Sequence, residues 1–289
     1  MTVIADPASP LAPRKHTAAA WHEGRRLPKK VWVGGGIVAS YVLMALLAPL
    51  IAPHDPLALD PIHRLAAPSR AHLLGTDELG RDELSRVIYA ARVDLLVGFL
   101  GALLPALVGT FVGALAGYFG RWADATVMRT ADVVQAFPTY ILIIALVFAL
   151  GQGLTSILIA FTIIAWVIYA RLIRGEILRI RGLDYVQAAR AAGLPSRRIL
   201  ALHALPNAIG QTIVYLPSDI VLATVGLVSL SYLGLGIPPP TPEWGSMIEA
   251  GQPYIRDQWW LAAVPGVVVV GFGLGLSLIG DGLSDWIRR

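Results

Sequence analysis

Cysteine is absent from this sequence of 289 residues, and charged residues are scarce. The missing thiols exclude disulfides, thiolate metal sites and cysteine nucleophiles. Charged residues make up 15% of the chain and hydrophobic residues 56%, whereas a soluble domain carries roughly 25% charged residues. The deficit falls in long uncharged windows separated by short charged ones. This pattern predicts an all-α integral membrane protein rather than a large soluble core.

Lysine is also scarce, because only Lys15, Lys29 and Lys30 occur. A phosphate-binding loop, which needs a lysine behind its glycines, is therefore impossible beyond residue 30. The sequences Gly-x-Ser-Gly and His-Glu-x-x-His are missing too, which argues against an intramembrane serine protease or a zinc protease. We expect the chain to be no enzyme and to hold no cofactor of its own, so any ATP is bound by another polypeptide.

Six apolar windows each have about the length that an α-helix needs to cross ~30 Å of hydrocarbon. They are residues 31–52, 93–117, 133–150, 156–172, 212–236 and 259–280. Little more than Gly151-Gln152-Gly153 separates the third and fourth windows, which predicts a helical hairpin with a tight outer turn. We therefore expect about six transmembrane helices.

The placement of Lys and Arg predicts the orientation. With the N-terminus and C-terminus in the cytosol, the inner pieces are 1–30, 118–132, 171–210 and 288–289, and they hold 17 of the 23 basic residues. The first of these is a predicted flexible basic tail, since it lacks a signal-peptide pattern. Residues 31–52 are then the first transmembrane helix, 53–92 an extracytoplasmic segment, and 93–289 a five-helix core with a cytosolic loop at 173–210.

The extracytoplasmic segment contains a short amphipathic stretch. Leu84, Val87, Ile88 and Ala91 fall on one stripe of a helix. We expect this helix to lie along the outer membrane surface before the chain turns inward. It is either a plain interfacial helix or a docking element for a partner.

The cytosolic loop has the pattern of a helix, a sharp turn and a second helix. Asp184 followed by Gln187 resembles a capping box that starts the first helix, and several alanines favour its continuation. Gly193 ends it, Pro195 suits the first turn of the second helix, and Pro206 ends that one. Residues 171–210, which are this loop and the two residues before it, carry seven arginines against two acidic residues, which favours either an acidic partner surface or lipid headgroups.

Gln187-Ala188-Ala189, then Gly193, then His203-x-Leu205-Pro206-Asn207 resembles the coupling motif of ABC importer permeases. In that family the motif forms a helix-turn-helix unit that seats in a groove of the ATP-binding subunit. Gln187 departs from the usual Glu, which keeps the capping role but loses any salt bridge. The resemblance implies that ATPase coupling rests on Asp184, Gln187, Ala188, Ala189, Gly193, Pro195, Arg197 and Arg198.

Further segments from residue 72 onward are similar to dipeptide, oligopeptide and nickel permeases, in the order of the C-type subunit. They are Gly75-Thr76-Asp77, Gly80-Arg81-Asp82, Ser85-Arg86, residues 231–236, Pro238-Pro239-Pro240 with Glu243-Trp244-Gly245, and residues 280–283. The resemblance implies an ABC importer type I permease-like fold. It also implies the permease subunit of an ATP-driven peptide importer in the cytoplasmic membrane of a prokaryote, with a nickel or other small-solute importer as the alternative.

The same resemblance implies partners. These are a second homologous permease, ATP-binding subunits that hold ATP and Mg, and an extracytoplasmic substrate-binding protein, with membrane lipid around the assembly and no nucleic acid. A stand-alone secondary transporter would need inverted repeats or more intramembrane charges, and the sequence has neither.

Asp219 is an isolated carboxylate in the fifth predicted span, just after Pro217 and Ser218. An intramembrane carboxylate is costly and usually faces a cavity or a polar partner. Asp219 therefore either lines or gates the transport path, or is an interface carboxylate bonded to serine or backbone.

Glycines spaced four residues apart mark close helix contacts. They are Gly109, Gly113 and Gly117 in the second span and Gly271 and Gly275 in the last. The sequence leaves open whether these contacts lie within the chain or at a partner permease. Three histidines of the outer segment, at positions 54, 63 and 72, share one loop, but no metal site is predicted there.

Overall fold

The computed structural model describes residues 27–288; residues 1–26, which hold most of the predicted tail, and residue 289 lie outside it. Helices dominate, and the described residues contain no strand. The helices are α1 (Lys29–Ile51), α2 (Glu83–Phe119), α3 (Arg121–Gln135), α4 (Thr139–Leu150), α5 (Leu154–Ile180), α6 (Asp184–Ala191), α7 (Ser196–Ile199), α8 (Leu205–Tyr232), α9 (Trp244–Gly251) and α10 (Trp260–Arg288). The predicted all-α class is confirmed.

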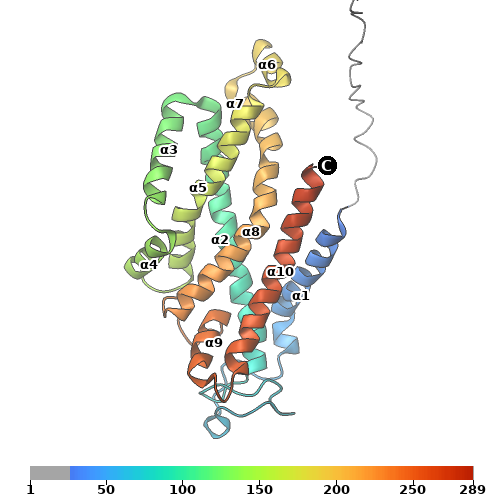
Figure 1. The fold of residues 1–289 in the computed structure, drawn as a ribbon, viewed down its shortest axis with the longest axis vertical. Coiled ribbons are helices and arrows are strands. Elements are labelled where there is room, and N and C mark those ends of the chain that lie inside the picture. Colours follow the sequence, from blue (N-terminus) through green and yellow to red (C-terminus); the bar gives the residue numbers. More distant parts are fainter. Residues whose placement is uncertain (1–26, 289) are drawn as a thin grey trace, which may run out of the picture.

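Long helices run side by side along the molecule (Figure 1). Five of them are long and apolar enough to cross a membrane, and the bent pair α3 and α4 brings the number to six if it counts as one span. The α6–α7 unit projects at one end, while residues 52–82 and α9 lie at the other end (Figure 1). Large apolar side chains such as Leu50, Phe148 and Val267 are exposed on the flanks, as expected for surfaces that face lipid or another subunit.

The amphipathic stretch predicted at 75–92 is not a separate interfacial helix, contrary to the prediction, and its helical part begins at Glu83. It forms the first turns of α2, a continuous helix of 37 residues. Its apolar stripe is buried inside the protein, where Val87, Ala90 and Ala91 pack against Trp244 and Met247 of α9. Sequence periodicity identifies an apolar face without identifying its partner, which here is the protein's own core.

The third predicted span is broken. α3 and α4 are bent by 88° relative to each other. Pro138 lies in the break, directly before α4, and a residue before proline is disfavoured in helical conformation. α4 has 12 residues and is therefore only about 18 Å long. The predicted hairpin of two full spans is thus replaced by a short α4 followed by the long α5.

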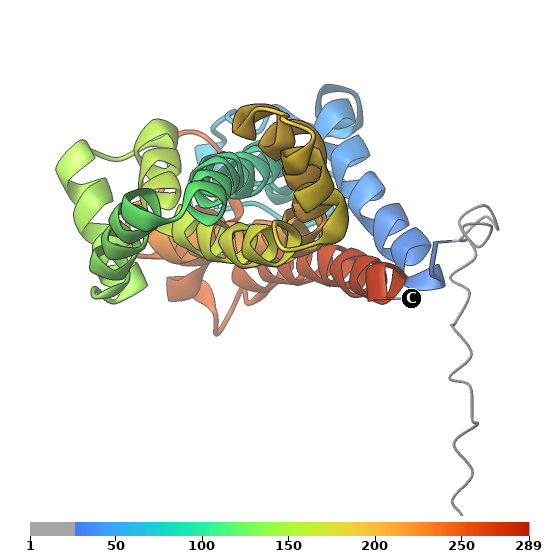
Figure 2. The same ribbon diagram turned by 90° about the horizontal axis from the view of Figure 1, so that it is seen from above.

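The glycine spacing of α2 marks a contact within this chain. α2 and α5 lie against each other in both views (Figures 1 and 2). A Cβ atom at Gly109, Gly113 or Gly117 would collide with backbone atoms of α5. These glycines let the two helix backbones approach closely, and we call this contact the α2–α5 seam.

A second close contact joins α1 to α10. Gly271 and Gly275 of α10 face Tyr41 and Ile37 of α1, with no room for larger side chains. The Tyr41 hydroxyl also donates a hydrogen bond to the Val268 carbonyl at 2.7 Å. Both glycine series therefore make contacts within the described chain, the first between α2 and α5 and the second between α1 and α10.

Candidate functional site

The segment Asp184–Asn207, which we call the protrusion, extends beyond the helical bundle (Figure 1). α6 ends as predicted at Gly193, whose φ of +78° lies in the left-handed region. The Gly193 amide donates to Arg190 at 3.0 Å and the Leu194 amide donates to Ala189 at 3.2 Å. These two bonds form a Schellman motif, which satisfies the last carbonyls of the helix and fixes the turn.

The base of the protrusion is anchored in a hydrophobic cluster. Val186 and Ile199 are fully buried, and they pack with Ile173, Ile177 and Ile180 of α5. Most of the predicted coupling residues are exposed on the outer side: Asp184, Gln187, Ala188, Gly193, Pro195, Arg197 and Arg198, with Ala189 half-buried. The protrusion is therefore a solid knob with a packed base and a free outer surface.

The predicted capping box is wrong. Leu183, not Asp184, precedes the first helical residue of α6, and no side chain caps this end. The Gln187 amide instead donates to the Arg181 carbonyl at 2.9 Å. This bond ties α6 to the end of α5, so Gln187 stabilises the protrusion through a different contact from the predicted one.

Pro206 does not end a short second helix, contrary to the prediction. Helix continues from Ser196 to Tyr232, with a π-turn over Leu200–Ala204 immediately before the proline. Because proline has no N–H and its ring crowds the preceding turn, a wider turn accommodates it. The Asn207 side chain also donates to the His203 carbonyl at 2.6 Å.

The seven arginines of residues 171–210 fall into two groups, those bonded to other parts of the chain and those exposed on the protrusion. Arg171 and Arg174 bond to Asp132 and Asp124 of α3, Arg179 pairs with its neighbour Glu176, and Arg181 donates to backbone carbonyls of α2. The remaining three arginines of this loop are exposed and form no ion pair with any described residue. They are Arg190, Arg197 and Arg198.

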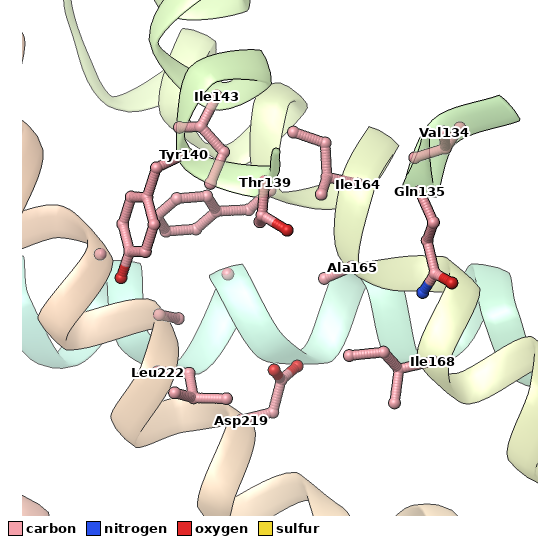
Figure 3. Close-up of a pocket in the computed structure, with 14 residues that line it drawn as sticks. Val134, Gln135, Thr139, Tyr140, Ile143, Ile164, Ala165, Ile168, Asp219 and Leu222 are labelled. Atoms are coloured by element: carbon pink, nitrogen blue, oxygen red, sulfur yellow. The ribbon is translucent and has the colours of Figure 1, made fainter. Parts of the chain in front are cut away.

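Asp219 lies beside a cavity of about 320 Å³ between α2, α3, α4, α5 and α8. Its carboxylate points from α8 into this cavity, whose wall includes Gln135, Thr139 and Tyr140 (Figure 3). Asp219 is the only charged residue in the lining, and the other side chains are mainly apolar. The sequence identified this carboxylate, but it could not identify the cavity.

The partner of Asp219 is neither of the two that the sequence suggested. The hydroxyl of Tyr169 on α5 donates to the Asp219 carboxylate at 2.9 Å. Tyr169 is fully buried and is 50 residues away in the chain. An aromatic residue inside an apolar run carries no local signal of this contact, so sequence reasoning missed it.

The segments 75–82 and 243–245 make contacts that hold together the end of the molecule opposite the protrusion. Asp77 accepts from the backbone and side chain of Arg81. The backbone amide of Trp244 donates to Asp94 of α2 at 3.1 Å, and the Glu243 carboxylate caps α9 by accepting from Gly245 and Ser246. These contacts fasten the outer loops and α9 to the start of α2.

Comparisons with known proteins agree with this architecture. Residues 109–289 match the family described as "binding-protein-dependent transport system inner membrane component". Residues 29–68 match the N-terminal transmembrane domain of oligopeptide transport permease C. Among solved structures, a chain of the MetNI methionine ABC transporter has a TM-score of 0.56 at 19% identity, with 71% of this chain and 97% of that chain covered. The likeness confirms the predicted fold of an ABC importer permease.

Curated relatives are similar over almost the whole chain. The dipeptide transport system permease protein DppC of Alkalihalophilus pseudofirmus is 37% identical, with 97% of this chain and 93% of the relative covered. The oligopeptide transport system permease protein OppC of Bacillus subtilis is 34% identical, with 94% and 90% covered.

Proposed function

Because this chain belongs to the family of binding-protein-dependent transport system inner membrane components, and is thus a membrane-embedded transport permease, we propose that its solute is a short peptide. The relatives described as dipeptide or oligopeptide permeases support this choice. We further propose that the chain is non-catalytic and that separate subunits bind ATP and Mg. A second permease and an extracytoplasmic binding protein complete the assembly.

We propose that the protrusion transmits movement of an ATP-binding subunit to the membrane-spanning helices. Its packed base supports this role, since Val186 and Ile199 are seated against α5. The exposed arginines at 190, 197 and 198 fit an acidic groove on that subunit. A rigid knob moves as a unit when its outer surface is displaced, so little of the movement is lost in local bending.

The helices that carry the protrusion also line the cavity. α5 leads into α6 and contributes Phe161 and Ile168 to the cavity wall, while the helix from Ser196 to Tyr232 contributes Asp219. This continuity is the observation that carries the proposal, because displacement of α6 and α7 is passed to the cavity walls. The Asp219–Tyr169 bond spans the same two helices, so we propose that it opens or shifts when the path changes its accessibility.

Reconstitution of the complete transporter tests the proposed function. The chain is purified with its partner subunits in proteoliposomes, and uptake of a labelled dipeptide is measured together with ATP hydrolysis. We expect uptake that requires both ATP and the external binding protein. Uptake of radioactive nickel without dipeptide uptake would establish the alternative solute, and uptake by this chain alone would refute the ATP-coupled assignment.

A further inference from the structure

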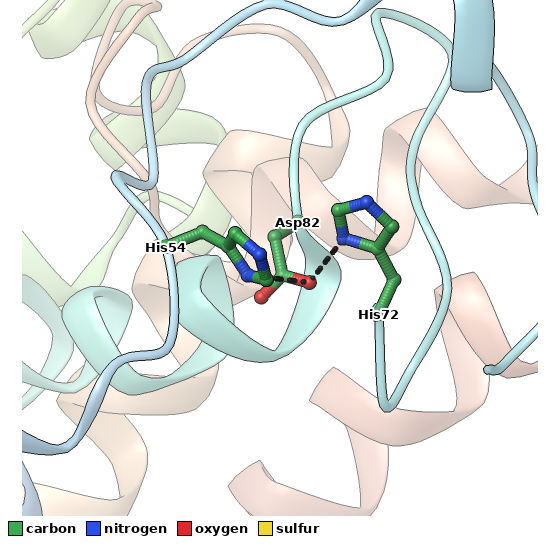
Figure 4. A group of neighbouring side chains, drawn as sticks. All are labelled: His54, His72 and Asp82. Carbon is green, nitrogen blue, oxygen red and sulfur yellow. Dashed lines mark hydrogen bonds and ion pairs between the residues drawn. The ribbon is translucent and has the colours of Figure 1, made fainter. Parts of the chain in front are cut away.

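Two histidines and an aspartate converge at the end of the molecule opposite the protrusion. His54 follows α1, His72 lies in the long connection to α2, and Asp82 directly precedes α2 (Figure 4). Nδ1 of His72 is 2.9 Å from Oδ1 of Asp82, and Nδ1 of His54 is 3.5 Å from the same oxygen. One potential ligand atom from each side chain lies within 4.8 Å of the others.

Backbone contacts hold the three side chains in this arrangement. Oδ2 of Asp82 accepts from the Ser85 amide at 2.9 Å and from its hydroxyl at 2.7 Å, which directs Oδ1 toward the imidazoles. The His54 amide donates to the same Ser85 hydroxyl at 3.0 Å. The His72 amide donates to the Ser69 hydroxyl at 3.1 Å. Such outer contacts orient metal ligands in proteins.

The chemistry of the cluster suits a small divalent cation. Zinc bound at ~2.0–2.1 Å by nitrogen and oxygen separates tetrahedral ligands by roughly 3.3–3.4 Å, close to the two separations that involve Asp82. No described Lys or Arg forms an ion pair with this carboxylate, so its charge is available to a cation.

We propose that His54, His72 and Asp82 form a zinc site. The side chain of His54 is 41% exposed and that of Asp82 only 1% exposed, so the ion enters from the His54 side and rests on a buried carboxylate. Water completes the coordination from the exposed side. The site joins three separate segments, namely the end of α1, the connection at residue 72 and the start of α2, and it is independent of the solute that the permease carries.

Without a metal, the same geometry would be a capped helix start with two charge-assisted hydrogen bonds. The two roles differ in their response to Asp82→Asn, because Asn caps a helix as well as Asp does but is a much weaker zinc ligand. His63 provides a matched control. It lies in the same connection, but its Nδ1 is 2.7 Å from Asp60 instead of Asp82.

Calorimetric titration of the full-length chain in detergent with zinc chloride, without a histidine tag, tests the site. We expect binding near one equivalent, weakened at least tenfold by His54→Ala, by His72→Ala and by Asp82→Asn, and unchanged by His63→Ala. Thermal unfolding should show a zinc-dependent rise in Tm that the three variants lose, while Asp82→Asn keeps the Tm of the metal-free protein. Absence of zinc binding at 100 μM or below, or affinity unchanged in all three variants, would overturn the proposal. Because no transport is measured, the result is independent of the proposed function.

Discussion

The structure requires glycine both at Gly193 in the protrusion and at Gly113 in the α2–α5 seam, but for opposite reasons. Gly193 has a positive φ and no atom within 4 Å of the position that a Cβ would occupy. Gly113 is helical, and a Cβ there would collide with Ala170 of α5. The seam is therefore specified by packing, whereas the turn of the protrusion is specified by local backbone conformation in open surroundings.

Gly113→Leu should have the largest effect on folding. Overpacking a core costs about 1–3 kcal/mol and occasionally more, and the obstacle here is backbone of α5, so we expect about 3 kcal/mol or more. Denaturant unfolding and the yield of monodisperse protein in detergent measure the loss. Gly175→Leu is the matched control, because Gly175 lies on α5 with open space around it. If both variants fold equally well, the seam is not a tight contact.

Gly193→Trp should separate folding from coupling. The left-handed conformation costs a non-glycine residue about 1–2 kcal/mol, but the space around Gly193 is open, so the chain should still insert and assemble. A bulky indole on the outer surface of the knob should disturb its fit in the ATP-binding subunit without releasing that subunit. We expect dipeptide uptake to fall at least tenfold while the subunits still co-purify or ATP hydrolysis persists.

Gly193→Asn provides the control for that variant, since Asn tolerates the left-handed region and is small. It should retain most of the uptake. Normal substrate-stimulated transport by Gly193→Trp would count against the protrusion as the coupling element, and equal loss in both variants would locate the defect in the turn itself.

Asp219→Leu tests whether the cavity contributes to transport. The change removes the only charge in the cavity lining and leaves the buried Tyr169 hydroxyl without its acceptor, which costs about 1–3 kcal/mol. We expect uptake to fall about tenfold with subunit assembly retained. Adding Tyr169→Phe should restore stability but not uptake. Parallel loss of assembly and uptake, both recovered in the double variant, would make the pair purely structural.

Local sequence signals predicted the features that depend on neighbouring residues. Five of the six apolar windows became long helices, because an uncharged run has few alternatives in a bilayer. The turn at Gly193 was predicted because a glycine after an alanine-rich helix commonly adopts the left-handed conformation. The family resemblance added the expected partners and the role of the protrusion, which physical patterns alone had left open.

Features that depend on distant residues could not be predicted in this way. Pro206 was read as a helix end, but the π-turn before it and the bond from Asn207 carry the helix through. Pro138 is a local signal for a break, but the apolar window around it does not give the 88° angle between α3 and α4. Tyr169 is indistinguishable in the sequence from any other aromatic residue of a span, and only the fold brings it to Asp219.

Arg197→Ala and Arg198→Ala should have the smallest effects, and they sharpen the comparison between an open surface and a packed seam. Exposed charge pairs contribute about 0–1 kcal/mol each, so we expect each change to weaken binding of the ATP-binding subunit roughly two- to fivefold, since 1.4 kcal/mol corresponds to about tenfold. The loss should shrink as ionic strength rises, because salt screens exposed charges.

Arg171→Ala removes an equal charge that is already paired with Asp132 on α3, and it should leave the affinity unchanged. Affinity measured by biolayer interferometry at low and high salt distinguishes these cases, and an equal loss in all three variants would mean that net charge, rather than the outer surface of the protrusion, attracts the partner.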